Sequence, residues 1–283
     1  MRHRSILFAG GADAANLVSW LRISILYGRR AMSTLPHDNW FTDDSFWETF
    51  EFAMFTPARF ESVPEEIDAV LALTEAQPGA DVLDLCCGPG RHTLELCRRG
   101  CHVTGVDRTA HYLNKLRESA ETEGLTPELV ESDMREFVRP DGFDLVINMY
   151  TSFGYFEDPA EDRRVARNIY ESLRPGGVFL LETMGKERLA NIWRDSNWRR
   201  EEDGTIVIEE RRVTRDWTWI ENTWTIIREG RQQSFSLAHR VYSAAEIKAL
   251  FGECGFSDVR VFGSLQGDPY DNNATRLVLV ARK

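Results

Sequence analysis

The feature that most constrains the fold is a regular alternation of short apolar runs and longer amphipathic segments between residues 82 and 183. The apolar runs have the length of buried strands. The segments between them carry helix signals such as capping residues, first-turn prolines and terminal glycines. This alternation predicts an α/β fold, with a mostly parallel sheet covered by helices on both faces. The strand candidates are VLDLCC, HVTGVD, ELVESD, FDLVINMY and VFLLET, in chain order.

The alternation stops after the fifth strand candidate, and an insertion follows. Residues 205–242 have the pattern of three strands without an intervening helix, which predicts a three-stranded antiparallel insertion within residues 190–243. The tetrapeptide SAAE then has the capping-box pattern that opens one further helix. The last two strand candidates, 258–263 and 276–283, complete a doubly wound, seven-stranded sheet whose last strand we expect to be antiparallel.

The N-terminal part differs from the rest of the chain in composition. Residues 1–31 contain five arginines and a single acid, Asp13. An arginine-rich, acid-poor start is typical of a transit peptide. Our hypothesis is instead that this part is an extension and that Met32 is the true start, which the intact mass of the native protein would test. We expect an aromatic N-terminal cap over residues 32–75, followed by the main domain over 76–283.

Composition argues against several classes of partner. The formal net charge is -11, whereas nucleic-acid-binding proteins usually present a basic face, so no nucleic-acid partner is expected. The apolar stretch LVSWLRISILY is interrupted by Arg22 and is too short to span a bilayer, so no membrane partner is expected. The five cysteines lack C-x-x-C spacing. This predicts no metal site, but free, buried thiols in the reducing cytoplasm.

Polar residues follow four of the expected strands, at the points where those strands end. Gly88 and Gly90 come after the first strand, Asp107 ends the second, Asp133 the third and Asn148 the fourth. In an open parallel sheet, ligands bind beyond the carboxyl ends of the strands. Glycines let a ligand approach the main chain, and Asp107 stands where an acid binds the ribose hydroxyls of an adenine nucleoside. Both aspartates could instead be helix or strand-end caps.

The residues after the glycine loop narrow the choice of ligand. A dinucleotide-binding fingerprint requires a third glycine where this chain has Thr93, and no G-K-[ST] sequence is present to hold a triphosphate. Arg91 and His92 fall in the first turn of the next helix, where positive charge opposes the helix dipole by roughly 0.3–1 kcal/mol. A nearby carboxylate, from the protein or from a ligand, would offset that charge; the alternative is that Arg91 points to solvent.

Five sequence blocks, in this order and at this spacing, resemble the class I S-adenosylmethionine-dependent methyltransferases. They are VLDLCCGPGR, VTGVD, ESDMREF, FDLVINMYTSFGYF and LRPGGVFLLE. The resemblance covers roughly residues 60–283 and implies a Rossmann-like fold with S-adenosyl-L-methionine as the cofactor. The insertion followed by R-x-Y-S, here Arg240, Tyr242 and Ser243, is similar to the small-molecule branch of that family.

The resemblance also implies residues that hold the methionine part of the cofactor. Gly88 and Gly90 would lie against it, and Asp84 would order the loop and reach the amino group through water. Arg59 would pair with the carboxylate, and Asn148 would lie below the sulfonium.

For the adenosine part, the resemblance implies three further residues. Asp107 would bind the ribose hydroxyls, and Asp133 would accept a hydrogen bond from the adenine amino group. The backbone of Met134 would face the adenine ring.

The acceptor side is expected near three groups of aromatic residues. They lie at 38–60, in SFGYF at 152–156 and in the tryptophan-rich insertion. Together they could form a dry lid; alternatively they are ordinary packing, because aromatic residues favour strands. His239 alternates onto the same strand face as apolar residues. His239 and Tyr150 are the candidate general bases, although a buried, structural histidine is the alternative for His239.

These patterns together predict methyl transfer to a nitrogen or oxygen nucleophile of a small molecule by in-line displacement. Two alternatives stay open at this point. One is a nicotinamide-dependent oxidoreductase on a similar sheet, and the other is a non-catalytic, cofactor-binding or regulatory subunit. The inserted sheet could also be the contact surface of a homodimer.

Overall fold

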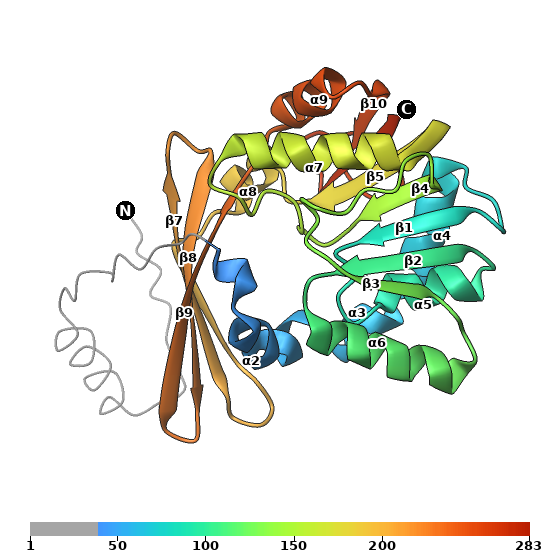
Figure 1. The fold of residues 1–283 in the computed structure, drawn as a ribbon. Coiled ribbons are helices and arrows are strands. Elements are labelled where there is room, and N and C mark those ends of the chain that lie inside the picture. Colours follow the sequence, from blue (N-terminus) through green and yellow to red (C-terminus); the bar gives the residue numbers. More distant parts are fainter. Residues whose placement is uncertain (1–38) are drawn as a thin grey trace, which may run out of the picture. The chain divides into compact units, whose positions relative to one another are not determined.

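The structure is a computed structural model that describes residues 39–283. The predicted extension over residues 1–31 and the first residues of the predicted cap lie outside this range. The described part contains a seven-stranded main sheet and a separate four-stranded sheet (Figure 1). The main sheet is formed by β1 (Asp81–Leu85), β2 (His102–Asp107), β3 (Glu128–Glu131), β4 (Phe143–Asn148), β5 (Leu173–Thr183), β10 (Ser257–Phe262) and β11 (Leu277–Arg282).

The main sheet has the strand order β10-β11-β5-β4-β1-β2-β3. β1 pairs in parallel with β2 and β4, β2 pairs in parallel with β3, and β4 does so with β5. β11, the last strand of the chain, lies antiparallel between β5 and β10. The predicted mostly parallel, seven-stranded sheet with an antiparallel last strand is therefore confirmed. Because β1 to β4 run in one direction, their carboxyl ends meet at one edge of the sheet.

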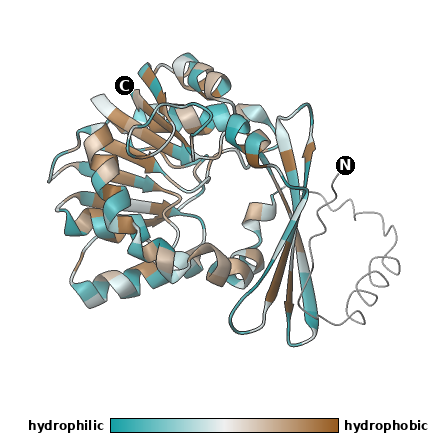
Figure 2. Ribbon diagram, turned by 180° about the vertical axis from the view of Figure 1, so that it is seen from behind, coloured by the Kyte–Doolittle hydropathy of each residue, from teal (hydrophilic) through white to brown (hydrophobic). Residues whose placement is uncertain are grey.

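Helices cover both faces of the main sheet, which makes the fold doubly wound (Figure 1). The helices are η1 (Trp40–Thr42), α2 (Asp44–Met54), α3 (Pro57–Glu61), α4 (Val63–Thr74), α5 (Arg91–Arg98), α6 (Ala110–Glu123), α7 (Pro159–Ser172), α8 (Lys186–Ile192) and α9 (Ala244–Glu253). Val82 and Leu145 pack with α4 and α5, whereas Leu83 and Val146 pack with α7 and α9. Both faces of the central strands are therefore apolar, as buried parallel strands require (Figure 2).

The insertion forms a four-stranded antiparallel sheet, so the expected three strands were one too few. β7 (Ile206–Thr214), β8 (Trp219–Arg228) and β9 (Arg231–Arg240) match the expectation, and β6 (Ser196–Arg200) adds an edge strand beside β7. β6 has the sequence SNWRR and mostly exposed side chains, so it lacks the apolar alternation that marks a strand. Its pairing with β7, which a pattern within one segment cannot reveal, decides its conformation.

Helix α2 lies between the two sheets (Figure 1). Phe46 and Phe50 of α2 pack on Val207, Ile226 and Leu237 of the antiparallel sheet. The aromatic N-terminal segment and the insertion, which are far apart in the sequence, therefore lie side by side.

The R-x-Y-S segment ties the insertion to α7 and to the connection before it. Arg240 Nη2 donates to the Glu157 carbonyl at 2.7 Å, and the Tyr242 hydroxyl donates to Asp162 Oδ2 at 2.6 Å. Ser243 forms the predicted capping box of α9. These contacts give the segment a structural role.

The structure can be compared with two expectations drawn from composition, one on buried thiols and one on membrane spans. All five cysteines are free thiols; Cys87, Cys101 and Cys254 are buried, whereas Cys86 and Cys97 are half-buried. The expectation of buried thiols therefore holds for three of the five. No helix within residues 39–283 combines the length and the apolar character needed to cross a membrane.

Candidate active site

The glycine loop connects β1 to α5, and its two glycines have different neighbours. Gly88 and Gly90 adopt positive φ of 55° and 84°, which favours glycine at both positions. A methyl group placed on Gly90 would lie 2.1 Å from Leu116 Cδ1 of α6. On Gly88 it would lie 3.3 Å from the ring of Phe55. Gly88 lines the cavity beside the loop, whereas Gly90 is the point at which α6 packs against the loop.

Asp84 and Asn148 lie beneath the loop and are not among the described residues that line the cavity. Asp84 is buried and accepts a hydrogen bond from Thr93 Oγ1 at 2.7 Å, and burial raises the pKa of its carboxyl. Asn148 donates from Nδ2 to the Leu85 carbonyl at 2.9 Å and thereby joins the ends of β4 and β1. Both side chains therefore order the loop from below.

Asp107 at the end of β2 lines the cavity and holds the loop. Its carboxylate accepts from the Gly88 amide and from the Thr109 amide, each at 2.8 Å. Burial raises the pKa of Asp107, although these two hydrogen bonds act in the opposite direction. The side chain thus serves as the cap before α6 that the sequence allowed, and it also faces the cavity, where a carboxylate oxygen can accept a further hydrogen bond.

Asp133 and Met134 follow β3 and also line the cavity. Arg135 donates from Nε and Nη2 to the two carboxylate oxygens of Asp133, at 3.0 and 2.8 Å. Burial alone would raise the pKa of Asp133, but the hydrogen bonds and charge of Arg135 outweigh it and lower the pKa. Asp133 is therefore an ionised acceptor at the cavity wall.

A cluster of charged side chains surrounds the Tyr150 ring. The guanidinium carbons of Arg59 and Arg91 lie 4.6 and 4.3 Å from the ring centre. Arg91 Nη1 donates to Glu66 Oε2 at 3.2 Å, and His92 Nε2 lies 2.9 Å from the same oxygen. Burial would raise the pKa of Glu66, but the hydrogen bond with His92 and the charge of Arg91 lower it to about 2. Glu66 is thus the carboxylate that the charges at the start of α5 required.

Arg91 does not point to solvent. Its side chain is 4% exposed, and Nη2 is buried without a hydrogen-bond partner among the described residues. Arg91 also lines the cavity, together with the half-buried Arg59. A buried donor without a partner is costly, so this atom is available to an anionic group of a ligand. Arg91 was not among the predicted site residues. The sequence signal that could have identified it is its positive charge in the first turn of a helix, where that charge opposes the helix dipole.

The backbone is strained where β4 ends. Tyr150 and Thr151 both have positive φ, 66° and 64°, and such conformations cost non-glycine residues of order 1–3 kcal/mol each. Glu182 holds this turn, because its side chain accepts from the Tyr150 amide at 2.8 Å and its carbonyl from the Thr151 amide at 3.1 Å. Strain of this kind gathers at functional sites, and both residues line the cavity.

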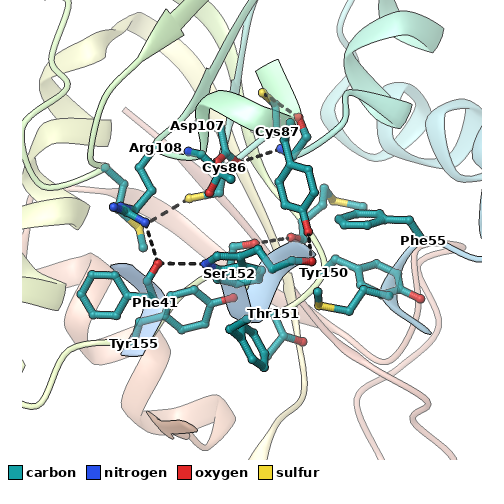
Figure 3. Close-up of a pocket in the computed structure, with 18 of the residues that line it drawn as sticks. Phe41, Phe55, Cys86, Cys87, Asp107, Arg108, Tyr150, Thr151, Ser152 and Tyr155 are labelled. Atoms are coloured by element: carbon teal, nitrogen blue, oxygen red, sulfur yellow. Dashed lines mark hydrogen bonds between the residues drawn. The ribbon is translucent and has the colours of Figure 1, made fainter. Parts of the chain in front are cut away.

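The cavity has a volume of about 330 Å³, within the usual range of ligand sites. Ten aromatic side chains line it, and they come from the N-terminal segment, α6, the β4–α7 connection and β8. They are Trp40, Phe41, Phe46, Trp47, Phe55, Tyr112, Tyr150, Tyr155, Phe156 and Trp224. Figure 3 shows Phe41 and Tyr155 on the side opposite Asp107 and Cys87. All three aromatic groups singled out in the sequence therefore reach one cavity.

We call one part of this cavity the aromatic chamber. It is lined by Trp40, Phe46, Trp47, Tyr155, Trp224, Leu237 and His239. The Trp40 ring centre lies 4.9 Å from that of Tyr155 and 5.3 Å from that of Phe46. His239 belongs to the inner face of β9, as the alternation predicted. Burial and then the charge of Arg211 lower the pKa of His239 to about 4, so its ring is neutral at physiological pH and can accept a proton.

Comparison with known proteins identifies the kind of domain. Residues 82–177 match the family described as a methyltransferase domain. An uncharacterized methyltransferase of Synechocystis sp. is 30% identical over 145 residues, which are 50% of this chain and 57% of that protein. The solved structure of an S-adenosylmethionine-dependent methyltransferase from Clostridium acetobutylicum superimposes with a TM-score of 0.71 at 16% identity, covering 84% of this chain and 98% of that one.

A second solved structure carries the cofactor. It is CalS10, an amino pentose methyltransferase from Micromonospora echinaspora with S-adenosylmethionine bound, at a TM-score of 0.60 and 24% identity over 84% of this chain and 96% of that one. Likeness at this level shows the fold, and the family match over residues 82–177 adds the activity. Residues 82–177 are therefore a methyltransferase domain, and the described part of the chain has the class I fold of S-adenosylmethionine-dependent methyltransferases, whose cofactor is S-adenosyl-L-methionine.

Proposed function

We propose that this methyltransferase acts on a nitrogen or oxygen nucleophile of a small molecule, by in-line displacement. The observation that carries the proposal is the continuity of one cavity, which reaches from the acidic strand ends of the main sheet into the aromatic chamber. A cavity of about 330 Å³ that is lined by aromatic rings suits a small molecule better than a polymer. CalS10, which shares the fold, is an amino pentose methyltransferase.

The residues present fit the cofactor at both of its ends. For adenosine, Asp107 would bind the ribose hydroxyls, Asp133 the adenine amino group and Met134 the ring. All three line the cavity, and the two carboxylates keep acceptor capacity beside their present partners. These assignments can be tested one residue at a time by cofactor-binding measurements.

At the methionine end, Gly88 leaves the loop open to the ligand and Arg59 would pair with the carboxylate. The Nη2 atom of Arg91, buried and without a partner within residues 39–283, supports a second guanidinium at the same place. Gly90, Asp84 and Asn148 would act from below, by holding the loop. When bound, the cofactor supplies an electrophilic methyl group on a sulfonium. The protein's task is to hold the acceptor in line with it.

His239 is proposed as the group that receives the acceptor's proton. It lines the aromatic chamber as a neutral ring, which is the state that a base requires. Tyr150 is the weaker candidate, because its ring lies against Arg59 and Arg91 and is not part of the aromatic chamber. His239→Ala is expected to reduce turnover more than cofactor affinity. If the variant binds the cofactor equally and turns over at the wild-type rate, His239 has no part in the mechanism.

The first experiment is the melting temperature with S-adenosylmethionine, S-adenosylhomocysteine and NAD, each in excess. A ligand that binds only the folded state adds about 2.7 kcal/mol at a hundredfold excess over its Kd. A higher melting temperature with S-adenosylmethionine and with S-adenosylhomocysteine, and no change with NAD, supports the proposed site. A shift with NAD alone argues for the oxidoreductase alternative, which the structure disfavours because Thr93 Oγ1 occupies the place of the third glycine and bonds Asp84. Homodimer formation and the absence of nucleic-acid and membrane partners stay predictions.

A further inference from the structure

The charges around the cavity are unfavourable for a cationic acceptor. Among the described lining residues, the carboxylates are Asp107 and Asp133, whereas Arg59, Arg91 and Arg108 supply three guanidinium groups. Asp133 is paired with Arg135, and Asp107 accepts two backbone amides. The aromatic chamber therefore contributes no carboxylate. An ammonium group placed there would gain about 0.5–2 kcal/mol from the aromatic faces. It would find no counter-charge to offset the loss of its hydration, which costs several kcal/mol.

The inner face of the antiparallel sheet adds positive charge beside the chamber. Arg211 on β7 does not line the cavity, but its charge reaches His239 and disfavours the imidazolium form. Glu209, the acid on the same face of that strand, is already paired, since it accepts from Arg211 Nη2 at 2.5 Å and from Arg199 Nη1 at 2.7 Å. Arg211 Nε is buried without a hydrogen-bond partner in the described part of the chain. A neutral or anionic nucleophile fits this surrounding and an ammonium does not.

The indole N–H groups of two tryptophans of the chamber are already satisfied by main-chain carbonyls. Trp40 Nε1 donates to the Ala238 carbonyl at 2.6 Å, and Trp47 Nε1 donates to the Phe41 carbonyl at 2.9 Å. The indole rings of Trp40 and Trp47 therefore present hydrocarbon faces to the chamber. A sugar has many hydroxyls, and each would lose hydrogen bonds to water in such a place. A flat, apolar acceptor instead gains from burial against aromatic faces.

We infer that the acceptor is an aromatic molecule with a ring hydroxyl, bound in the aromatic chamber with that hydroxyl beside His239, and that the product is an aryl methyl ether. The acceptor oxygen forms the bond to the methyl carbon as the carbon–sulfur bond breaks and leaves its electron pair on sulfur. The hydroxyl donates a hydrogen bond to the neutral His239 ring, and its proton leaves by way of the ring to solvent, so that no lasting imidazolium forms beside Arg211. This inference rests on the proposed function and narrows it to one class of nucleophile.

A matched panel of acceptors tests the inference with the full chain and S-adenosylmethionine. The panel contains 2-naphthol and 4-nitrophenol as aryl hydroxyls, 1-naphthylmethylamine as an aromatic ammonium, and glucosamine as an amino sugar. Release of S-adenosylhomocysteine and the mass of the methylated product are measured for each. We expect the aryl hydroxyls to be turned over at least about tenfold faster than the amines, corresponding to at least about 1.4 kcal/mol of discrimination.

Ser152 allows the charge argument to be tested by one substitution. It lines the cavity, and its hydroxyl donates to the Met149 carbonyl at 3.0 Å. Ser152→Asp places a carboxylate on the cavity wall beside Tyr155 of the chamber, whose side chain hydrogen-bonds Ser152, and should shift the preference toward 1-naphthylmethylamine by about tenfold or more. Ser152→Asn, which has the same shape and no charge, is the control and should leave the preference unchanged. Melting curves of both variants show whether each is folded.

The outcomes separate this inference from the proposed function. Turnover of an amine with none of either aryl hydroxyl overturns the inference and leaves the small-molecule methyltransferase intact. The inference is also overturned if S-adenosylmethionine raises the melting temperature and neither aryl hydroxyl is methylated. If neither S-adenosylmethionine nor S-adenosylhomocysteine changes the melting temperature, the proposed cofactor site itself is wrong.

Discussion

Replacing Glu66 by glutamine removes the carboxylate that balances the charges at the start of α5. Glu66 lies 3.2 Å from Arg91 Nη1 and 2.9 Å from His92 Nε2, and its pKa is lowered from 4.5 to about 2. One pKa unit corresponds to about 1.4 kcal/mol, so this shift is worth about 3 kcal/mol of folding free energy at neutral pH. The side chain is 22% exposed, so solvent screening makes this figure an upper bound.

The sign of the pH dependence follows from the direction of that shift. Because the pKa of Glu66 is lower in the folded state, its contribution is fully present above pH 4.5 and is lost as the pH falls through about 2. Glu66→Gln should therefore lower the free energy of unfolding at neutral pH by up to about 3 kcal/mol. It should also flatten the pH dependence of stability over that acidic window.

Urea unfolding followed by tryptophan fluorescence, at neutral pH and in the acidic window, measures both effects. Glu65→Gln is the matched control, since Glu65 is an exposed neighbour on the same helix and its loss should change stability by less than about 0.5 kcal/mol. If the Glu66 and Glu65 variants lose the same stability, with the same pH dependence as the wild type, the ion-pair argument is refuted.

Three further predictions concern the loop and the cavity. Gly90→Ala should destabilise the fold by about 2–4 kcal/mol in urea unfolding, because its methyl group would meet Leu116 at 2.1 Å in a left-handed backbone. Gly124→Ala, left-handed but in open space, should cost only about 1 kcal/mol. Asp107→Asn should weaken S-adenosylmethionine binding about 10- to 100-fold by calorimetry, and unchanged affinity would exclude it as a ligand. Because the pKa of His239 is lowered to about 4, turnover should keep its rate as the pH falls through 6.5, and a titration with that midpoint would contradict a neutral, buried base.

The succession of strands and helices along the chain was predictable from the sequence because it depends on local signals. The apolar runs, the caps and the glycines fix each strand and helix from residues that lie next to one another. Parallel strands then place Asp107 and Asp133 at one edge of the sheet, whatever the rest of the chain does. The strand face on which His239 lies was predictable in the same way, because a strand alternates its side chains between two faces.

Features that depend on a distant partner were not predictable. The edge strand β6 forms through its pairing with β7, and the counter-charge of Arg91 comes from Glu66 on another helix. Gly90 lacks a side chain because of Leu116, a helix contact that the motif does not name. Asn148 ends its strand as predicted, but its side chain turns under the loop toward Leu85.

The sequence by itself therefore determined a doubly wound sheet with a glycine loop and an acidic edge, since short-range periodicity encodes these. Only the tertiary structure decided that the aromatic residues of α2, the β4–α7 connection and β8 line one chamber, which has no carboxylate among its described lining residues. The reason is physical. Burial, hydrogen bonding and charge are properties of neighbours in space, and those neighbours come from segments that no local pattern connects.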